Sequence, residues 1–554
     1  MNGPVSTPRR APAPPVSPAP PDVAGAEVRA LSAWLCSADC GTAVSASVYE
    51  TARLVSTAPW LAGHERRVAF LVASQLDDGA WSGPEDYRLV PALSAAEALL
   101  AELGRRLASG AVSRAAEAVL RALPVLLARA GEGLPDTIAA EYLIPWLVQE
   151  VNARLAHLAE APAGAPPLAR DALALRLPPP ALADGSALRR LHAAADAGQP
   201  LPGTVAHSWE VLGTRGRRSA AVAPVAGAVG LSPAATAAWL AGPDECPAAG
   251  HPCLDYLEST QRRYGGPVPG VSPISVFERA WVVSALAEAG LGGALPDTVV
   301  TALRADLGER GAPAGPGLPP DADDTAAVLH ALALTGDPQP ADCLRPYESD
   351  AWFTCFPGER TPSTSTNAHI LEALGTAVAR DAEEGRWLRA ARAKIASWLL
   401  DAQHADGSWT DKWHASPFYA TACCAVALAR HGNASAAPAV RRAVDWVLGN
   451  QRADGSWGCW EGTDEETAYA VRTLLLTTEP RGPADPPPVP GLDDAAARGG
   501  AFLTRPGAGA TVPPLWHDKD LYAPHTVVHA ARLAAIHLTR SRSRGGHTRT
   551  AGVR

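Results

Sequence analysis

Apolar residues recur along this chain at the spacing of helices, whereas the alternation typical of β-strands is scarce. Runs of Leu and Ala dominate, and hydrophobic residues make up 47% of the 554 residues, which is enough to build large cores. We therefore predict an all-α protein with two or more domains. The first helical stretch, residues 26–44, places Leu31, Trp34 and Leu35 on one face.

Proline-rich segments interrupt this helical pattern and predict loops and tails. Prolines cluster in residues 160–187 and 480–490, where we expect surface crossings between helices. Residues 1–25, rich in Pro and Ala, are predicted to form a disordered tail and lack the pattern of a signal peptide. Residues 539–554 predict a basic C-terminal tail. The chain has no apolar run of about 18 residues, so we expect no membrane span.

Three segments repeat the pattern Gln-x3-Gly-x-Trp, and an aromatic-aliphatic pair stands five and four residues before each Gln. We interpret each copy as the end of a helix with its aromatic residue on the buried face, followed by a Gly turn and a Trp that folds back. The Gln amide can tie the turn to the start of a neighbouring helix, so the repeat indicates architecture rather than chemistry. The copies are Gln75-Gly79-Trp81, Gln403-Gly407-Trp409 and Gln451-Gly455-Trp457, preceded by Phe70-Leu71, Trp398-Leu399 and Trp446-Val447.

Residues 321–324, Asp-Ala-Asp-Asp, place three carboxyl groups at the predicted start of a helix. Three neighbouring carboxyls cannot all ionise cheaply, so at least one should hold its proton near neutral pH. The positive end of the helix would stabilise the carboxylate that remains after the proton is given away. Both properties belong to a general acid. The alternative interpretation is that Asp324 is only a helix N-cap.

The acid segment and the Gln-Trp repeats together resemble the class II terpene cyclases, in which an Asp-x-Asp-Asp-Thr-Ala motif protonates a polyene and such repeats brace α-helical barrels. Over roughly residues 50–535, further motifs follow the order of the copalyl diphosphate synthase branch of that family. They are Cys253-Leu254-x-Tyr256-Leu257, Gly265-Gly266-Pro267-Val268-Pro269, Phe277-Glu278-x-x-Trp281, Cys355-Phe356, Asp411-Lys412-Trp413 and Trp516-x-x-Lys519-x-Leu521-Tyr522.

The resemblance implies a fold of two α-helical (α/α) barrel domains of the βγ type. The first helix, residues 26–44, would pack with the β domain, and the γ domain would be inserted at residues 45–262. The β domain, which carries the acid motif, would occupy residues 263–538. A deep, mostly apolar cleft is expected between the two domains and suits a polyprenyl chain.

The resemblance also implies roles at the acid motif. Asp323 matches the family's proton donor, and Asp321 and Asp324 are its electrostatic and hydrogen-bonding neighbours. A donor aimed at the Asp323 oxygen that does not carry the proton would strengthen the acid by stabilising its conjugate base. His369 occupies the position where the plant enzymes have a supporting Asn, and Asn367 is the alternative. Residues two apart on a helix face different ways, so only one of them should reach the acid.

Only three of the 48 basic residues are Lys, namely Lys394, Lys412 and Lys519, so a retained Lys is expected to have a specific task. Lys412 and Lys519 lie in segments that match the family, whereas Lys394 lies on an ordinary helix. We predict that Lys412 and Lys519 bind the substrate diphosphate as point charges. The alternative is that they form ion pairs with neighbouring carboxylates, Asp411, Asp518 or Asp520.

Two departures from the family pattern concern a metal and a base. The plant enzymes have an acidic, magnesium-associated cluster after a His-Ser-Leu-Glu segment, but no such cluster follows His207-Ser208-Trp209-Glu210 here. Mg²⁺ is therefore implied by the resemblance only, with its ligands unknown and Glu210, Glu85 and Asp86 as candidates. The plant enzymes also use an Asn after Val-Pro as part of the terminating base. This chain has Gly270 there, so the final deprotonation cannot be carried over.

A class I ionising motif is not evident, because Asp493-Asp494 is followed by Ala-Ala-Ala-Arg and offers no third carboxylate. The diphosphate should therefore survive the reaction. The favoured function is conversion of geranylgeranyl diphosphate to a bicyclic diphosphate of copalyl, halimadienyl or clerodane type. The alternatives are the same chemistry on farnesyl diphosphate to give drimenyl diphosphate, a squalene-hopene-type cyclase, and a non-catalytic toroid that only binds a lipid or a partner.

Composition narrows the partners and the compartment. The formal net charge of −9 gives no general attraction to nucleic acid, so the expected partner is a polyprenyl diphosphate. The nine Cys show no CxxC pair or regular framework, which is typical of reduced thiols in a cytoplasmic protein. The sequence does not define the oligomeric state.

Overall fold

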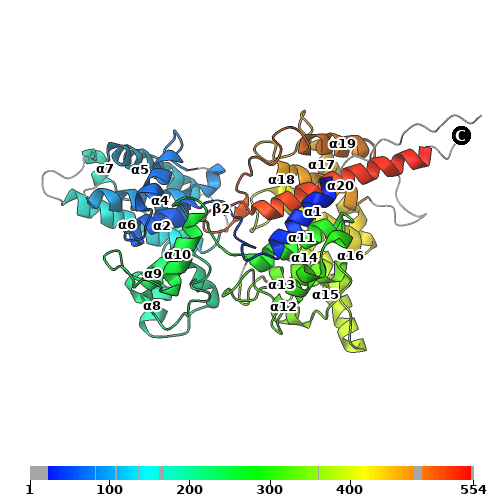
Figure 1. Cartoon of the computed structure of the whole chain (residues 1–554), viewed down its shortest axis with the longest axis horizontal. Coiled ribbons are helices and arrows are strands. Elements are labelled where there is room, and N and C mark those ends of the chain that lie inside the picture. Colours follow the sequence, from blue (N-terminus) through cyan, green and yellow to red (C-terminus); the bar gives the residue numbers. More distant parts are fainter. Residues whose placement is uncertain are drawn as a thin grey trace, which may run out of the picture.

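A computed structural model of the chain describes residues 23–81, 83–105, 109–131, 133, 137–160, 168–359, 361–478 and 489–550. These residues form two helical lobes that lie side by side (Figure 1). The predicted all-α class is confirmed, because the only sheet among the described residues is one short strand pair. The predicted N-terminal tail lies outside the described residues as far as residue 22.

One lobe, called the γ lobe, contains the helices from residue 48 to residue 262. Helices α2, α4 and α6 contact one another in turn, and α9 and η3 pack beside them. Helix α4 is buried along almost its whole length, because Ala and Leu occupy most of its positions. The elements of the γ lobe are α2 (Val48–Thr57), α3 (His64–Ala73), η1 (Glu85–Tyr87), α4 (Leu89–Gly104), α5 (Gly110–Ala130), α6 (Ala140–Ala159), α7 (Arg170–Ala174), η2 (Ala181–Ala183), α8 (Ser186–Asp196), η3 (Gly203–Gly216), α9 (Pro233–Leu240) and α10 (Pro252–Arg262).

The other lobe, called the β lobe, contains α1 and the helices from residue 275 onward. Helices α11, α13, α14, α16, α18 and α20 contact one another in this order, and α20 returns to α11, so that they close a ring. Helix α1 packs outside this ring against α11 and α20. The elements are α1 (Val23–Leu35), α11 (Ser275–Glu288), η4 (Gly292–Ala294), α12 (Asp297–Asp306), α13 (Ala322–Leu334), η5 (Asp342–Tyr347), α14 (Thr364–Thr376), α15 (Ala382–Asp401), α16 (Pro417–His431), η6 (Ala434–Ala436), α17 (Ala437–Gly449), α18 (Asp464–Leu476), α19 (Leu492–Leu503) and α20 (His525–Thr550).

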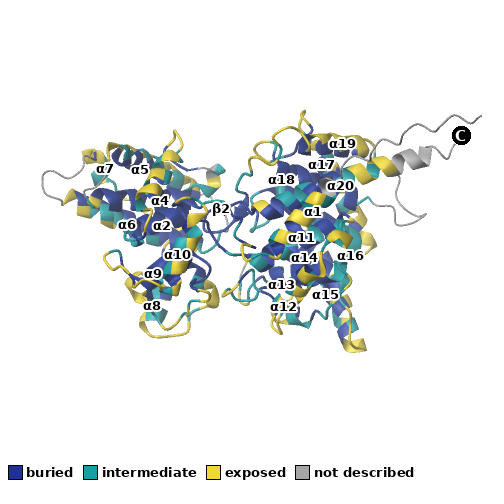
Figure 2. Ribbon diagram, viewed as in Figure 1, coloured by how far each residue is buried: buried dark blue, intermediate teal, exposed yellow. Residues whose placement is uncertain are grey.

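Each lobe has its own core, and Figure 2 shows buried residues concentrated in the interior of both. The core of the β lobe also takes in side chains from the last part of the γ lobe, including Leu231, Leu240 and Leu257. The two cores therefore meet at the junction of the lobes. Strands β1 (Trp516–His517) and β2 (Leu521–Tyr522) form a small antiparallel hairpin that belongs to this junction (Figure 1).

The Gln-Trp repeats are ties between outer helices, as the sequence predicts. Each repeat Trp is fully buried and donates its indole N–H to a backbone carbonyl of the preceding helix, at 2.7–2.9 Å. Each repeat Gln donates to the Gly carbonyl of its own turn and to the next outer helix; for Gln403 these acceptors are Gly407 and Ala439, both at 2.9 Å. The turn needs glycine, because Gly407 has φ +99° and a Cβ there would lie 2.5 Å from the Arg442 carbonyl oxygen.

Three expectations require correction. In each lead-in pair the aliphatic residue is the fully buried one and the aromatic residue is only half-buried, because Leu71, Leu399 and Val447 point into the core. The first helix ends at Leu35 rather than near residue 44. The segment expected to begin a tail at residue 539 instead continues helix α20 to Thr550. Among the described residues, no helix has the length and apolar content needed to cross a membrane.

Candidate active site

The three acidic residues lie at the start of α13 and differ in exposure. Asp321 is the N-cap, and its Oδ1 accepts the backbone N–H of Asp324 at 2.8 Å. Asp321 and Asp324 are buried, whereas 14% of the Asp323 side chain is exposed. Asp323 is therefore the residue of the motif that a substrate can reach.

Burial favours the protonated form of both neighbours of Asp323. It raises the pKa of Asp321 to about 7, although the N–H of Asp324 opposes this rise. Burial, helped by the charge of Asp321, holds the pKa of the Asp324 carboxyl well above its usual range. Oxygen Oδ1 of Asp324 is buried and has no hydrogen-bond partner among the described residues. These raised pKa values agree with the prediction that at least one carboxyl at this helix start holds its proton near neutral pH.

The structure brings His369 to the acid and leaves Asn367 away from it. His369 Nδ1 lies 2.8 Å from Asp323 Oδ1. Burial alone would lower the pKa of His369, but the Asp323 carboxylate beside it raises that pKa well above its ordinary value. A protonated His369 donates Nδ1–H to Asp323. The amide of Asn367 instead bonds the backbone of Phe353, at 2.9 and 3.0 Å, and the Ser363 carbonyl at 2.8 Å, so it shapes the loop before α14.

Aromatic rings surround the acid where the starts of the ring helices meet. Trp281 stands edge-on to His369 with ring centroids 5.2 Å apart, and its indole N–H donates to the Tyr419 hydroxyl at 3.1 Å. Trp516 of the hairpin lies 4.8 Å from the Tyr419 ring and 5.3 Å from the Phe277 ring. Sequence patterns pointed to Phe277, Trp281 and Trp516, but nothing in the sequence singled out Tyr419. This cluster defines an apolar wall suited to a polyene.

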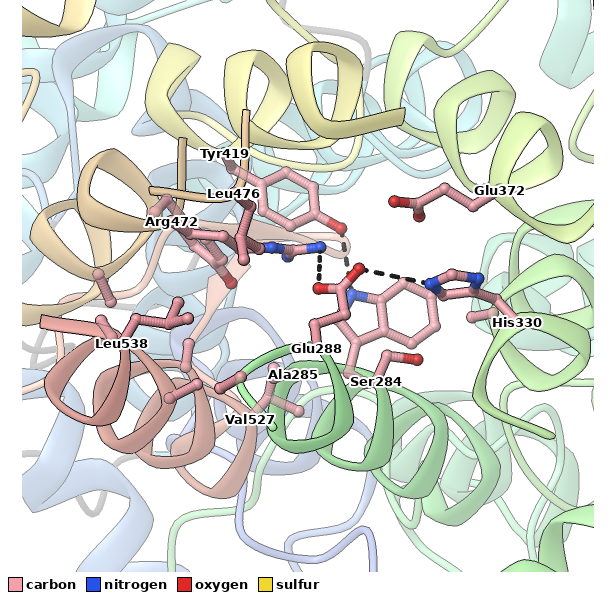
Figure 3. Close-up of a pocket in the computed structure, with 18 of the residues that line it drawn as sticks. Ser284, Ala285, Glu288, His330, Glu372, Tyr419, Arg472, Leu476, Val527 and Leu538 are labelled. Carbon is pink, nitrogen blue, oxygen red and sulfur yellow. Dashed lines mark hydrogen bonds and ion pairs between the residues drawn. The ribbon is translucent and has the colours of Figure 1, made fainter. Parts of the chain in front are cut away.

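A cavity of about 50 Å³, lined by His369, Trp281 and Tyr419 among others, holds a cluster of charged side chains (Figure 3). Glu288 occupies its centre, and the carboxylate contacts Arg472 at 2.6 Å, Arg430 at 2.7 Å and His330 at 3.4 Å. His330 Nδ1, Glu372 Oε1 and Ser284 Oγ are buried without a hydrogen-bond partner among the described residues. Such groups require water, and this volume is enough for a few molecules.

Two groups of residues could in principle hold a metal ion: the acidic and histidine side chains of the cavity, and the ligands predicted from the sequence. Glu288, His330 and Glu372 offer atoms within 4.8 Å of one another. However, two guanidinium groups already neutralise Glu288, so a divalent cation there would bury excess positive charge. Glu210 is buried and bound to the ammonium of Lys519 at 2.9 Å. Asp86 is exposed, and the side chain of Glu85 lies outside the described residues. Among the side chains that the structure describes, these residues do not assemble a magnesium site.

Neither predicted diphosphate-binding lysine has a free ammonium group. Lys519 is 1% exposed, and its three N–H groups go to Glu50 at 2.6 Å, Glu210 at 2.9 Å and Ser232 at 2.8 Å. Lys412 pairs with Glu359 and donates to the Thr361 carbonyl at 2.9 Å. The two lysines also do not form the alternative ion pairs with Asp411, Asp518 or Asp520, because the carboxylates that they contact are Glu359, Glu50 and Glu210. Asp411 instead accepts the Ser365 N–H at 3.1 Å, at the start of α14.

The hairpin turn, residues 518–520, inserts charged side chains into the γ lobe. Asp518 Oδ1 lies 2.7 Å from His207 Nε2, and Asp520 accepts the Ser47 hydroxyl at 2.7 Å. Asp518 Oδ2 accepts the Val271 N–H at 2.9 Å and would lie 2.5 Å from a Cβ at position 270. Gly270 therefore leaves room for this carboxylate, which explains physically why no side chain stands there.

A two-lobed helical fold, in which a partly exposed aspartic acid lies between two buried carboxyls of raised pKa and contacts a histidine, is typical of a class II terpene cyclase. Residues 360–475 match the model of the squalene-hopene cyclase C-terminal domain. The chain is 47% identical over 496 residues to ent-copalyl diphosphate synthase of Streptomyces sp. (strain KO-3988), covering 89% of this chain and 92% of that protein. It is 41% identical to labda-7,13-dienyl diphosphate synthase of Streptomyces clavuligerus, covering 89% of each chain.

Solved structures agree with the sequence relatives. The crystallised ent-copalyl diphosphate synthase of Streptomyces platensis is 46% identical, covers 94% of this chain and 100% of its own, and superposes with a TM-score of 0.85. The enzyme of Arabidopsis thaliana is 17% identical, covers 93% of this chain and 63% of its own, and shares the fold with a TM-score of 0.56. The chain belongs to the bacterial class II diterpene cyclases of the copalyl diphosphate synthase type.

Proposed function

We propose that this protein cyclises geranylgeranyl diphosphate to a bicyclic diterpenyl diphosphate of copalyl type and leaves the diphosphate group in place. The contact of 2.8 Å between His369 and Asp323 carries the proposal, because it supplies the support that an alkene-protonating acid needs. The names of the relatives, copalyl and labdadienyl diphosphate synthases, favour a C20 substrate over farnesyl diphosphate.

The reaction begins with transfer of the Asp323 proton to the terminal double bond, far from the diphosphate. The O–H bond breaks, a C–H bond forms, and the resulting tertiary cation is attacked in turn by two further double bonds. Loss of a proton from a carbon next to the last cation forms the final double bond, so the atoms of substrate and product are the same. The carbon–oxygen bond to the diphosphate stays intact.

The neighbours of Asp323 tune this proton transfer. His369 donates to Oδ1, so the proton to be transferred is on the other oxygen, and the imidazolium stabilises the carboxylate that forms. The raised pKa values of Asp321 and Asp324 favour their neutral forms, and a neutral neighbour does not oppose the new negative charge. The cavity that His369 lines has room for water that can return a proton to the acid after each turnover.

The test compares geranylgeranyl and farnesyl diphosphates as substrates, with and without phosphatase treatment of the products. The expected result is faster turnover of the C20 substrate and a cyclic alcohol that appears only after phosphatase. Release of inorganic pyrophosphate in step with cyclisation, or a clear C15 preference, would contradict the proposal. A magnesium requirement, which rests on family resemblance, is tested by assaying the same reaction after chelation and after re-addition of the ion.

A further inference from the structure

A second carboxylate, Glu465, lies buried against the aromatic cluster, where its ion-pair contact among the described residues is with a histidine, His414. It stands in the first turn of α18, and its side chain is 0% exposed. Among the described residues, no Lys or Arg forms a salt bridge with it. A buried charge without a counter-ion is costly, so its retention calls for a physical reason.

The two groups that hold Glu465 are both aromatic. Trp516 Nε1 donates to Oε1 at 2.7 Å. His414 Nδ1 accepts the Ser416 N–H at 3.0 Å, so the ring proton is on Nε2, which lies 3.3 Å from the same Glu465 oxygen. Two N–H donors and the start of a helix stabilise the ionised form of Glu465. Its other oxygen, Oε2, is also buried, and the hydroxyl of Tyr469 on the same helix interacts with this carboxylate.

The rings bound to Glu465 are continuous with the wall beside the acid. The His414 ring stacks on Tyr419 with centroids 4.6 Å apart, and the Trp516 ring stands edge-on to His414 at 5.0 Å. Tyr419 in turn bonds Trp281, which contacts His369. An N–H donated to a carboxylate makes an aromatic ring richer in electrons, and an electron-rich face attracts a cation.

We propose that Glu465 is a positioning residue for cyclisation that acts through Trp516 and His414. Its carboxylate fixes the two rings and lends them negative charge, and both rings pack on Tyr419, which lines the cavity beside His369. Through Tyr419 this charge stabilises the cation that develops once Asp323 has given up its proton. This role rests on the proposed cyclase function. In this role, the positive charge of the reacting cation balances the buried negative charge of Glu465.

The test is Glu465→Gln, which removes the charge but keeps an oxygen that can accept from both rings. The matched control is Asp464→Asn in the same helical turn, because Asp464 pairs with Arg505 at 2.5 Å instead of with the aromatic rings. We expect Glu465→Gln to lower kcat on the order of 10- to 100-fold with little change in KM, and the control to stay near wild type. Wild-type kcat in a folded Glu465→Gln protein overturns the inference.

A binding experiment separates the electrostatic role from a purely structural one. The probes are an analogue of the C20 diphosphate with a protonated amine at the position of the ring cation, and its uncharged carbon counterpart. Glu465→Gln should weaken binding of the amine about as much as it lowers kcat/KM and leave the carbon analogue unchanged. Equal losses for both probes overturn the inference. Failure of the wild type to cyclise the substrate would instead contradict the proposed function.

A second variant guards against loss of folding. Trp516→Phe keeps a ring and removes the N–H that reaches Glu465. If the charge acts through the indole, the double variant loses no more activity than the more impaired single variant. Independent, multiplicative losses would show that Glu465 does not act through Trp516 and would overturn that part of the inference.

Discussion

Helices α13 and α18 begin with almost the same chemistry and put it to opposite uses. Each start carries three acidic residues, and in each the N-cap side chain accepts a backbone N–H from the third residue beyond it. The bond is 2.8 Å from Asp324 to Asp321 and 3.0 Å from Glu466 to Thr463. Local geometry therefore does not distinguish the two sites.

The difference lies in the donors that distant segments supply. On α13 the three carboxyls lie close together, and burial raises the pKa values of Asp321 and Asp324, which favours their protonated forms. On α18 each carboxylate has a partner from elsewhere: Arg505 for Asp464, Trp516 for Glu465 and Ser416 for Glu466. Burial also raises the pKa of Glu466, so the contrast rests on Asp464, which pairs with Arg505, and on Glu465, which accepts N–H groups from two aromatic rings. At a helix start, burial favours the protonated form of a carboxyl, and cationic or N–H donors favour its ionised form.

The largest expected effect comes from removing the proton of α13. Asp323→Asn should lower kcat by at least about 1,000-fold, because an amide has no proton acidic enough for an alkene. Product formation from the C20 diphosphate, together with the thermal melting curve, measures this. Near-wild-type turnover in a folded variant would show that another residue is the acid.

Removing the His369 side chain that contacts Asp323 should give the next largest effect. His369→Ala is expected to lower kcat about 100-fold by withdrawing the support of the conjugate base. Asn367→Ala is the control, since it loses three hydrogen bonds to backbone and should reduce stability by about 1–3 kcal/mol with little change in kcat of the folded protein. The reverse pattern of kcat losses would exchange the roles of the two residues.

Ionisation of Asp321 would place a negative charge at the start of α13. This charge would make Asp323 a weaker acid. Because the pKa of Asp321 is raised to about 7, the folded state holds this proton, and its contribution to stability is present in acid and lost as pH rises through about 7. Above that pH a new negative charge beside Asp323 opposes formation of a second carboxylate. We expect kcat to fall about tenfold per pH unit above pH 7.

Two variants identify the group responsible for this pH dependence. Asp321→Asn should abolish the fall in kcat near pH 7, at the cost of a lower maximum. Asp520 also titrates at about 7 because it is buried, but it lies at the junction of the lobes, so Asp520→Asn should keep the fall. A pH profile unchanged by Asp321→Asn would assign the fall to another group.

The smallest expected effect comes from adding a better donor to α13. The Cys355 thiol lies 3.8 Å from Asp321 Oδ1, and a serine hydroxyl there is a stronger donor to a carboxylate. Cys355→Ser should therefore lower the pKa of Asp321 and move the fall in kcat to lower pH by less than about one unit. A shift to higher pH would show that the hydroxyl accepts a hydrogen bond from Asp321 instead.

The sequence predicted the features that depend on local spacing. The Gln-Trp ties and the helix start at Asp321 follow from a repeated pattern or from residues a few positions apart. A family resemblance supplied the pairing of α13 with α14 and the choice of His369, which lies 46 residues from Asp323, over Asn367. The fold class followed because the helical pattern of Leu and Ala is strong throughout the chain.

The sequence failed where partners are far apart along the chain. Lys519 was expected to hold a diphosphate, but Glu50 and Glu210, which lie hundreds of residues away, use its donors. The sequence did not predict a role for Glu465, because Thr-Asp-Glu-Glu before an apolar run is an ordinary helix start. Only the fold shows that Trp516 and His414 come to rest against it.

The hairpin turn at residues 518–520 has a consequence for how such enzymes can be recombined. Its three charged side chains are matched to His207, Glu50 and Ser47 of the γ lobe. A chimera that joined the γ lobe of one family member to the β lobe of another would have to inherit both halves of this match, or it would bury charges without partners. New cyclases built by exchanging lobes should therefore keep residues 518–520 together with the γ lobe that receives them.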